Sequence, residues 1–209
     1  MDVRKFNCYT DDLTEAADIV KKGGIVIYPT DTLYGIGCNP YNEEAIKKVI
    51  HLKRRGTQPL PVLCSDINRA EALVHLGEAG RQLAHSFWPG GLTIVAKAVD
   101  NKLPGRLIGS SGTLGVRVPN HRGALKLIAL CGGCLIGTSA NISGEPTLET
   151  PEEILKVFDE KFDVLVYGGE KSLGTPSSVV DVVDGNIRII REGLVPSERI
   201  LQSMKDSMR

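Results

Sequence analysis

Hydrophobic and polar positions along the chain follow two periods, one typical of helices and the other typical of strands. Apolar residues three or four positions apart predict helices near 12–22, 43–52, 67–75, 78–87, 121–131 and 151–158. Short apolar runs bounded by Gly or Pro predict strands at 25–28, 60–64, 92–96, 114–118, 135–137 and 164–167. The alternation of these two kinds of element is typical of an α/β protein.

Local signals mark where some of these elements begin and end. Asp12 followed by Glu15 has the spacing of a capping box, so the first helix is expected to begin there. Gly23-Gly24 is expected to end the same helix. Pro61 lies in a predicted strand and favours a strand start or an edge position, because proline cannot donate a backbone hydrogen bond.

The last third of the chain adds an antiparallel connection. Segments 178–183 and 186–191 flank Asp184-Gly185, a pair typical of the turn in a β-hairpin. A hairpin joins antiparallel strands, whereas strict alternation of strands and helices would give a parallel sheet. We therefore expect one α/β domain with a twisted, mixed parallel and antiparallel sheet flanked by helices.

Composition narrows the class of protein. The 209 residues are 42% hydrophobic and 24% charged, as in soluble globular domains. Positive and negative side chains number 25 each, so any anion site has to be local. The N-terminus lacks the apolar region of a signal peptide, and no apolar run reaches the roughly 18 residues of a membrane span. With five scattered cysteines, these features predict a cytoplasmic protein with reduced thiols and no membrane contact.

Polar and cationic side chains gather at the ends of predicted elements, where α/β proteins bind ligands. The non-periodic segment 30–39 is expected to be a loop, and its Thr30 and Thr32 either satisfy a turn or contact a ligand. Lys53-Arg54-Arg55 closes a helix, where cations either complement the helix dipole or clamp a phosphate or carboxylate. Lys53 is expected on the solvent side of this helix end.

Two further segments could likewise have either a structural role or a role in binding a ligand. Arg117 lies in the apolar strand Val116-Arg117-Val118, and strand alternation turns its side chain away from both valines. It belongs either to the outer face of an edge strand or, beside the Gly-rich loop 104–113, to an anion site. The segment 138–144 follows a strand and carries three hydroxyls and an amide, more donors and acceptors than one turn uses.

The spacing of residues excludes several familiar kinds of functional site. The segment 168–172 lacks the glycines of a P-loop, and 137–141 lacks the final glycine of a nucleophile elbow. Cys131 and Cys134 have a CxxC spacing, but no second pair of ligands completes a zinc site. A structural or incidental role is therefore the favoured interpretation of the two cysteines.

Five motifs occur in order between about residues 12 and 195. They are Pro29-Thr30-Asp31-Thr32-Leu33-Tyr34-Gly35-Ile36-Gly37, Lys53-Arg54-Arg55 before Pro59-Leu60, Trp88-Pro89-Gly90-Gly91-Leu92-Thr93, Val116-Arg117-Val118-Pro119 and Ser139-Ala140-Asn141-Ile142-Ser143-Gly144. Together they resemble the threonylcarbamoyl-adenylate synthase family, the YrdC-like proteins. The resemblance implies one domain over 1–209 around an open cationic cleft, with a core of about 12–195 and a tail of 196–209. Gly91 and Ser178 depart from the Pro and Thr that are usual in the family.

The resemblance also implies an activity. Enzymes of this family are nucleotidyltransferases that condense L-threonine, bicarbonate and ATP into threonylcarbamoyl-AMP and pyrophosphate. A separate transferase complex then moves the threonylcarbamoyl group to the adenosine next to the anticodon of tRNA. Mg²⁺ is expected to arrive on the phosphates of ATP, because no Asp cluster marks a metal site made by the protein alone.

Site residues follow from the resemblance position by position. It implies that threonine is bound by Thr30, Thr32, Arg117, Gly137 and Ser177. It implies that ATP is bound by Lys53, Arg55, Thr113, Ser139, Asn141, Thr147 and Arg191, with Lys53 and Arg55 also catalytic. Cations and backbone N–H groups around two anionic reactants suit this chemistry, which needs positioning and no covalent nucleophile.

Two alternatives come from other functional classes. A module for double-stranded RNA would use a similar cationic surface, although the balanced charge and the 5% aromatic content disfavour it. A carbamoyl-transfer enzyme with another acceptor would share the fold. Pyrophosphate release that depends on threonine would separate the synthase from both, and a direct contact with tRNA or double-stranded RNA is left open.

Overall fold

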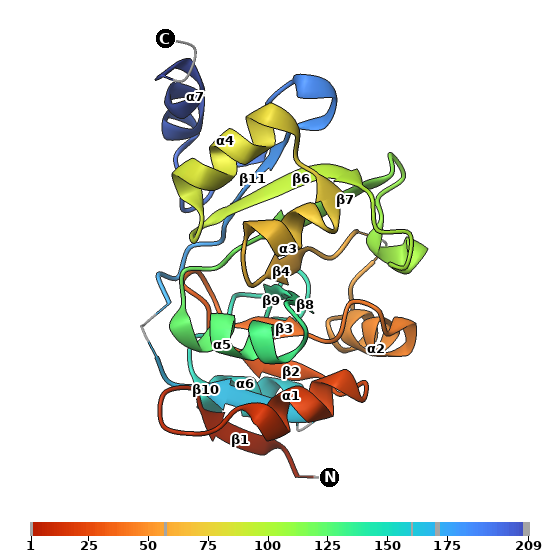
Figure 1. The fold of residues 1–209 in the computed structure, drawn as a ribbon. Coiled ribbons are helices and arrows are strands. Elements are labelled where there is room, and N and C mark those ends of the chain that lie inside the picture. The colour runs from red at the N-terminus through yellow and green to blue at the C-terminus, as the bar shows by residue number, and fades with distance from the viewer. Residues whose placement is uncertain (1, 57, 160, 170–171, 207–209) are drawn as a thin grey trace.

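The strands divide into two mixed sheets, shown in the lower and upper parts of Figure 1. The computed structural model of the chain describes residues 2–56, 58–159, 161–169 and 172–206. The five-stranded sheet has the order β1 (Arg4–Asn7), β10 (Val164–Tyr167), β2 (Val26–Tyr28), β3 (Gly35–Gly37) and β9 (Thr138–Ser139). Strands β1, β10 and β2 are parallel, while β3 is antiparallel to both of its neighbours. The α/β class and the mixed strand pairing are confirmed, but the structure has two sheets where one was expected.

The seven-stranded sheet contains the predicted hairpin. Its order is β12 (Arg188–Arg191), β11 (Ser178–Asp181), β6 (Leu92–Ala98), β7 (Thr113–Arg117), β4 (Val62–Cys64) and β8 (Cys134–Ile136), with β5 (Val74–His75) antiparallel to β6. Strands β11 and β12 are antiparallel, and a 3₁₀ turn at Val183–Gly185 joins them. Strand β4 lies between β7 and β8, so Pro61 precedes a strand start and does not mark an edge.

Seven helices lie in the described part of the chain, and most match the predicted segments. They are α1 (Thr14–Lys21), α2 (Glu43–Leu52), α3 (Ile67–Glu71), α4 (Gly77–Phe87), α5 (Arg122–Leu130), α6 (Pro151–Phe158) and α7 (Ser197–Asp206). The expected helix at 67–75 stops at Glu71, because the chain then enters β5 and pairs with β6. None of these helices is long and apolar enough to cross a membrane.

The capping box predicted for the first helix is wrong. The Asp12 carboxylate accepts hydrogen bonds from the backbone N–H and the hydroxyl of Thr14, at 3.0 and 2.7 Å. Glu15 instead forms an ion pair with Arg4 at 2.7 Å. The Asp–x–x–Glu spacing therefore serves two separate contacts, and sequence spacing alone could not distinguish them.

The C-terminal segment expected as a tail forms a helix packed on α4 as far as the structure describes it (Figure 1). Ile200 is completely buried, and the Gln82 side chain donates a hydrogen bond to the Ser203 carbonyl at 2.7 Å. The Arg199 guanidinium lies 6.0 Å from the Phe87 ring centroid, within cation–π distance. Residues 207–209 lie outside the described part of the chain.

The seven-stranded sheet has one face in the core and one face free for a ligand. On β6 and β7 the side chains of Leu92, Ile94, Leu114 and Val116 are buried in one apolar cluster. That cluster also contains Leu83 and Ala84 of α4, so this helix covers the face that carries these residues. The intervening residues point the other way, because strand side chains alternate.

The two sheets meet where β3 passes β8. The backbone N–H of Ile136 donates to the Cys38 carbonyl at 3.0 Å, and the chain then runs through Gly137 into β9 of the other sheet. A Cβ on Gly37 would lie 1.8 Å from the Ile136 carbonyl oxygen. Gly37 belonged to the expected loop, and its strand escaped prediction because glycine has a low strand propensity.

Gly37→Ala should therefore destabilise the protein by about 3 kcal/mol or more, since backbone must move to relieve the overlap. Gly105→Ala is the matched control, because its Cβ would meet nothing within 4 Å. Urea denaturation followed by circular dichroism measures both free energies of unfolding. Equal stability of the two variants would show that the sheets do not need this close approach.

Candidate functional site

A cavity of about 800 Å³ opens on the free face of the seven-stranded sheet. Every second residue along three strands contributes to its wall: Thr93, Val95 and Lys97 in β6, Thr113, Gly115 and Arg117 in β7, and Ser177 just before β11 with Val179 and Asp181 in it. Thr30 and Thr32 line it from the loop between β2 and β3, and Gly137 and Ser139 from the β8–β9 segment. The site is thus built where the two sheets face each other.

Most of the residues expected at the site lie in this wall. The cavity is lined by Thr30, Thr32, Arg55, Thr113, Arg117, Gly137, Ser139, Ser177 and Arg191. Lys53, Asn141 and Thr147 are not among its lining residues. Lys53 and Asn141 lie directly behind Ser139, whereas Thr147 is half-buried in the loop between β9 and α6.

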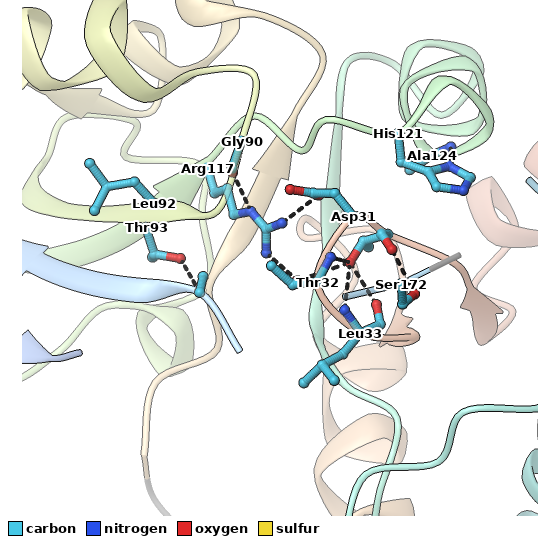
Figure 2. Close-up of polar contacts among 12 residues, drawn as sticks. Asp31, Thr32, Leu33, Gly90, Leu92, Thr93, Arg117, His121, Ala124 and Ser172 are labelled. Atoms are coloured by element: carbon cyan, nitrogen blue, oxygen red, sulfur yellow. Dashed lines mark hydrogen bonds and ion pairs between the residues drawn. The ribbon is translucent and has the colours of Figure 1, made fainter. Parts of the chain in front are cut away.

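Arg117 is the most constrained charge in the wall (Figure 2). Its side chain is 6% exposed, and its Nη2 lies 2.5 Å from Asp31 Oδ1. Its Nε donates to the Gly90 carbonyl and its Nη1 to Thr32 Oγ1, both at 2.8 Å. A guanidinium has five N–H groups, so among the described residues one N–H on each terminal nitrogen has no acceptor. Burial lowers the pKa of Arg117, and the adjacent Asp31 carboxylate opposes that shift.

The loop 30–33 is held together by the Thr30 hydroxyl. Thr30 Oγ1 donates to the Leu33 carbonyl at 2.6 Å and accepts from the backbone N–H groups of Thr32 and Leu33, each at 3.2 Å. It also lies 3.1 Å from Thr32 Oγ1. These contacts use the hydrogen-bonding capacity of this hydroxyl, so Thr30 shapes the turn and sets the position of Thr32.

Two further guanidiniums, those of Arg55 and Arg191, line the cavity. Burial lowers the pKa of Arg55, and the nearby charge of Arg191 lowers it further. Neither residue forms an ion pair with any residue that the structure describes. Arg191 is positioned by Ser177, whose carbonyl accepts from its Nε at 3.2 Å and its Nη2 at 2.7 Å. Two cations without a counter-ion that line one cavity favour an anionic ligand there.

Lys53 is buried, and the expectation of a solvent-side cation is wrong. Only 1% of the residue is exposed, because the end of α2 is covered by the segment after β9. Its Nζ donates to the Ser139 carbonyl, to the Asn141 carbonyl at 2.8 Å and to Asn141 Oδ1 at 3.2 Å. Burial, aided by the Arg55 charge, lowers the pKa of Lys53 to about 7. The contacts therefore make Lys53 the support of the wall at Ser139.

Three residues that act in the wall were not assigned a role from the sequence. Asp31 pairs with Arg117, Thr93 Oγ1 lies 2.9 Å from Ser177 Oγ, and Thr138 Oγ1 accepts from Arg55 at 3.4 Å. Thr93 is the one polar residue of the predicted strand 92–96, and the alternation of strand side chains could have placed it on the face opposite Leu92 and Ile94. The other two contacts join segments more than 80 positions apart, which local pattern does not reveal.

The wall contains both charge signs, with cations in excess. Its cationic side chains are Arg55, Lys97, Arg117, Arg188 and Arg191, and its carboxylates are Asp181 and Asp184. Asp181 pairs with Arg188 at 2.9 Å. Within the part of the chain that the structure covers, no three His, Cys, Asp or Glu side chains converge to hold a metal ion. The arrangement suits a ligand with several negative charges.

Lys53→Ala should destabilise the protein by roughly 2–4 kcal/mol, because it removes a buried ammonium that donates to three oxygens of the Ser139–Asn141 segment. Lys48→Ala is the control, since Lys48 is exposed on the same helix. Thermal and urea unfolding of both variants measure the difference. A Lys53 variant as stable as the Lys48 variant would contradict a supporting role for this side chain.

Comparison with known proteins agrees with this geometry. The family model for the Sua5, YciO and YrdC proteins, described as telomere recombination, matches residues 18–193. A Pyrococcus abyssi (strain GE5 / Orsay) protein named threonylcarbamoyl-AMP synthase is 34% identical over 187 residues, covering 88% of this chain and 55% of that protein. A Bacillus subtilis (strain 168) protein of the same name is 32% identical over 190 residues, covering 90% of this chain and 55% of that protein.

A solved structure extends the likeness to three dimensions. The structure of P. abyssi Sua5 complexed with L-threonine superposes with a TM-score of 0.89 at 31% identity, covering 98% of this chain and 61% of that one. The chain spans about half the length of the curated relatives that it matches. A family match over most of the chain, with the same fold, shows that this chain belongs to the Sua5/YciO/YrdC family.

Proposed function

We propose that this chain makes L-threonylcarbamoyladenylate and pyrophosphate from L-threonine, bicarbonate and ATP. The observation that carries the proposal is the charge arrangement of the cavity. Arg117 has one free N–H on each terminal nitrogen among the described residues, and Arg55 and Arg191 line the same cavity without counter-ions among those residues. An amino-acid carboxylate and a triphosphate would satisfy these two sets of cations at once. The names of the curated relatives support the same activity.

The threonine end of the reaction is assigned to Arg117, Thr32, Gly137 and Ser177. Arg117 would hold the carboxylate through its two remaining N–H groups, in the paired geometry that a guanidinium forms with carboxylates. Thr30 would act through the turn that fixes Thr32, since its own hydroxyl is engaged. Ser177, held by Thr93, would line the region where the amine becomes a carbamate.

The nucleotide end is assigned to Arg55, Arg191, Thr113 and Ser139. The carbamate oxygen would attack the α-phosphorus of ATP, and pyrophosphate would leave with the electrons of the broken P–O bond. Arg55 and Arg191 would stabilise the charge that develops on the phosphates, and positioning alone supplies about 7–11 kcal/mol in such two-substrate reactions. Mg²⁺ would enter on the triphosphate as part of the substrate MgATP.

Lys53, Asn141 and Thr147 complete the proposed ATP site in a different way. Direct contact of Lys53 with ATP would require its ammonium to leave the three oxygens that now accept from it. Asn141 receives this ammonium and the Ser139 hydroxyl, at 2.7 Å, so both residues would shape the wall at Ser139. Thr147 would reach the nucleotide only through movement of its loop.

The proposal extends to the product's further use. Threonylcarbamoyl-AMP would pass to a separate threonylcarbamoyl transferase complex that modifies tRNA. We also propose a cytoplasmic location and one catalytic domain over residues 1–209. A direct contact with tRNA is a further part of the proposal.

Pyrophosphate release from ATP should require threonine and bicarbonate together, and either omission should abolish it. Serine should be a poor but detectable substrate, because the missing methyl is worth about 1–3 kcal/mol. Valine should react much more slowly, since its side chain leaves the partners of the hydroxyl unpaired. A coupled pyrophosphate assay measures all five conditions. Equal rates with threonine, serine and valine would contradict the proposal and favour a carbamoyl transfer to another acceptor.

Arg117→Lys should weaken threonine binding about tenfold to a hundredfold, or roughly 1.5–3 kcal/mol, although the charge is conserved. An ammonium cannot keep the contacts with Gly90, Thr32 and Asp31 while also presenting two N–H groups to a carboxylate. Calorimetric titration with threonine and with MgATP measures the two affinities separately. Normal threonine affinity with weakened MgATP binding would contradict this assignment and show that Arg117 binds ATP.

A further inference from the structure

The CxxC segment has a partner that its spacing does not reveal. Cys134 lies in β8 directly opposite Cys64 in the antiparallel strand β4. Both thiols are buried, at 2% and 0% exposure, and both belong to the large apolar cluster under the sheet. Cys131 is in the other apolar cluster, together with residues of α1 and α5. The relevant pair is therefore Cys64 with Cys134.

The hydrogen-bond pattern shows that the two cysteines form a close cross-strand pair. The Ser65 N–H donates to the Gly133 carbonyl at 3.0 Å, and the Gly137 N–H donates to the Pro61 carbonyl at 3.1 Å. Hydrogen-bonded and non-hydrogen-bonded pairs alternate along an antiparallel ladder, so Cys64 and Cys134 are a non-hydrogen-bonded pair. Such pairs have Cα atoms about 4.5 Å apart, within the range of about 4.4–6.8 Å that a disulfide spans.

Arg69 supplies a cation beside one of the two thiols. Its Nη2 lies 3.4 Å from Cys134 Sγ, and its Nε is buried without a hydrogen-bond partner among the described residues. A guanidinium in this position stabilises a thiolate, which is the form that attacks a disulfide or another oxidant. Burial raises the pKa of the Cys64 thiol, its neighbour Cys134 adds to that effect, and the Arg69 charge opposes it. The direct contact with Arg69 favours Cys134 as the first nucleophile of the pair.

The turn before Cys134 offers a route for a small oxidant. Gly132 is exposed and Gly133 is half-buried, and both have positive φ values, +93° and +88°. An oxidant would reach the buried Cys134 thiol only if this turn moved. Leu63 of β4, Pro61 just before that strand and Gly137 just after β8 line the main cavity, so a cross-link here would connect two segments of its wall.

We propose that Cys64 and Cys134 form a reversible intrachain disulfide, with Arg69 promoting attack by Cys134. The Cys134 thiolate attacks a small disulfide oxidant, such as oxidised glutathione, and releases one thiolate from it. The Cys64 sulfur then attacks Cys134 in the mixed disulfide and releases the second. The two cysteines lose two protons and two electrons in total, and the oxidant becomes two thiols. The proposal is independent of the synthase activity.

The test is peptide mapping of the full chain after exposure to oxidised glutathione. Remaining thiols are alkylated after denaturation, and the protein is digested without reductant. A peptide linking residues 64 and 134, lost on treatment with dithiothreitol, is the expected product. Alkylation of both Cys64 and Cys134 after oxidation, or a link between Cys131 and Cys134, would overturn the proposal.

Two variants test whether the cross-link is specific to Cys64 and Cys134 and whether Arg69 promotes it. Cys131→Ser should give the same cross-link as the unmodified chain, and loss of the link in this variant would overturn the pairing. Arg69→Gln should slow formation of the cross-link severalfold, while circular dichroism checks that the fold is kept. An unchanged rate in folded Arg69→Gln would overturn the role of Arg69.

Discussion

The buried guanidinium of Arg117 connects the two sheets and defines the site between them. It extends from β7 of the seven-stranded sheet and contacts Asp31 and Thr32, which follow β2 of the five-stranded sheet. Its third contact is the Gly90 carbonyl, in the segment after α4. A charge that is 6% exposed is tolerated only when it is paired and hydrogen-bonded, so these three contacts constrain the positions of all three segments.

The same constraint organises the chemistry of the cavity. Asp31 neutralises Arg117, so a carboxylate bound there benefits mainly from the geometry of the two remaining N–H groups. Arg55 and Arg191 lack such neutralisation among the described residues, and they favour a ligand of higher negative charge. In the proposed function, Arg117 therefore takes the single carboxylate, and Arg55 and Arg191 take several phosphate oxygens. Lys53 lies behind the cavity wall and donates hydrogen bonds to the Ser139 and Asn141 carbonyls, which holds the Ser139 segment in position.

Sequence pattern predicted the elements well and their tertiary relations poorly. Helix α2 has the bounds expected from its apolar period, and the polar loop at Thr30 and the cation at Arg117 both line the cavity. The division into two sheets was missed, because it depends on the Gly37 backbone passing the carbonyl of Ile136, a residue distant in the chain. The burial of Lys53 was missed for a similar reason, since the acceptors for its ammonium lie on another segment.

A structure of this chain with bound L-threonine tests the central role of Arg117 most directly. The account predicts the threonine carboxylate about 2.7–2.9 Å from the terminal nitrogens of Arg117, with the contacts to Asp31 and Gly90 preserved. That result would show that Arg117, which connects the two sheets, also binds the amino acid. A carboxylate bound instead to Arg55 or Arg191, with Arg117 making no contact with the amino acid, would contradict the account.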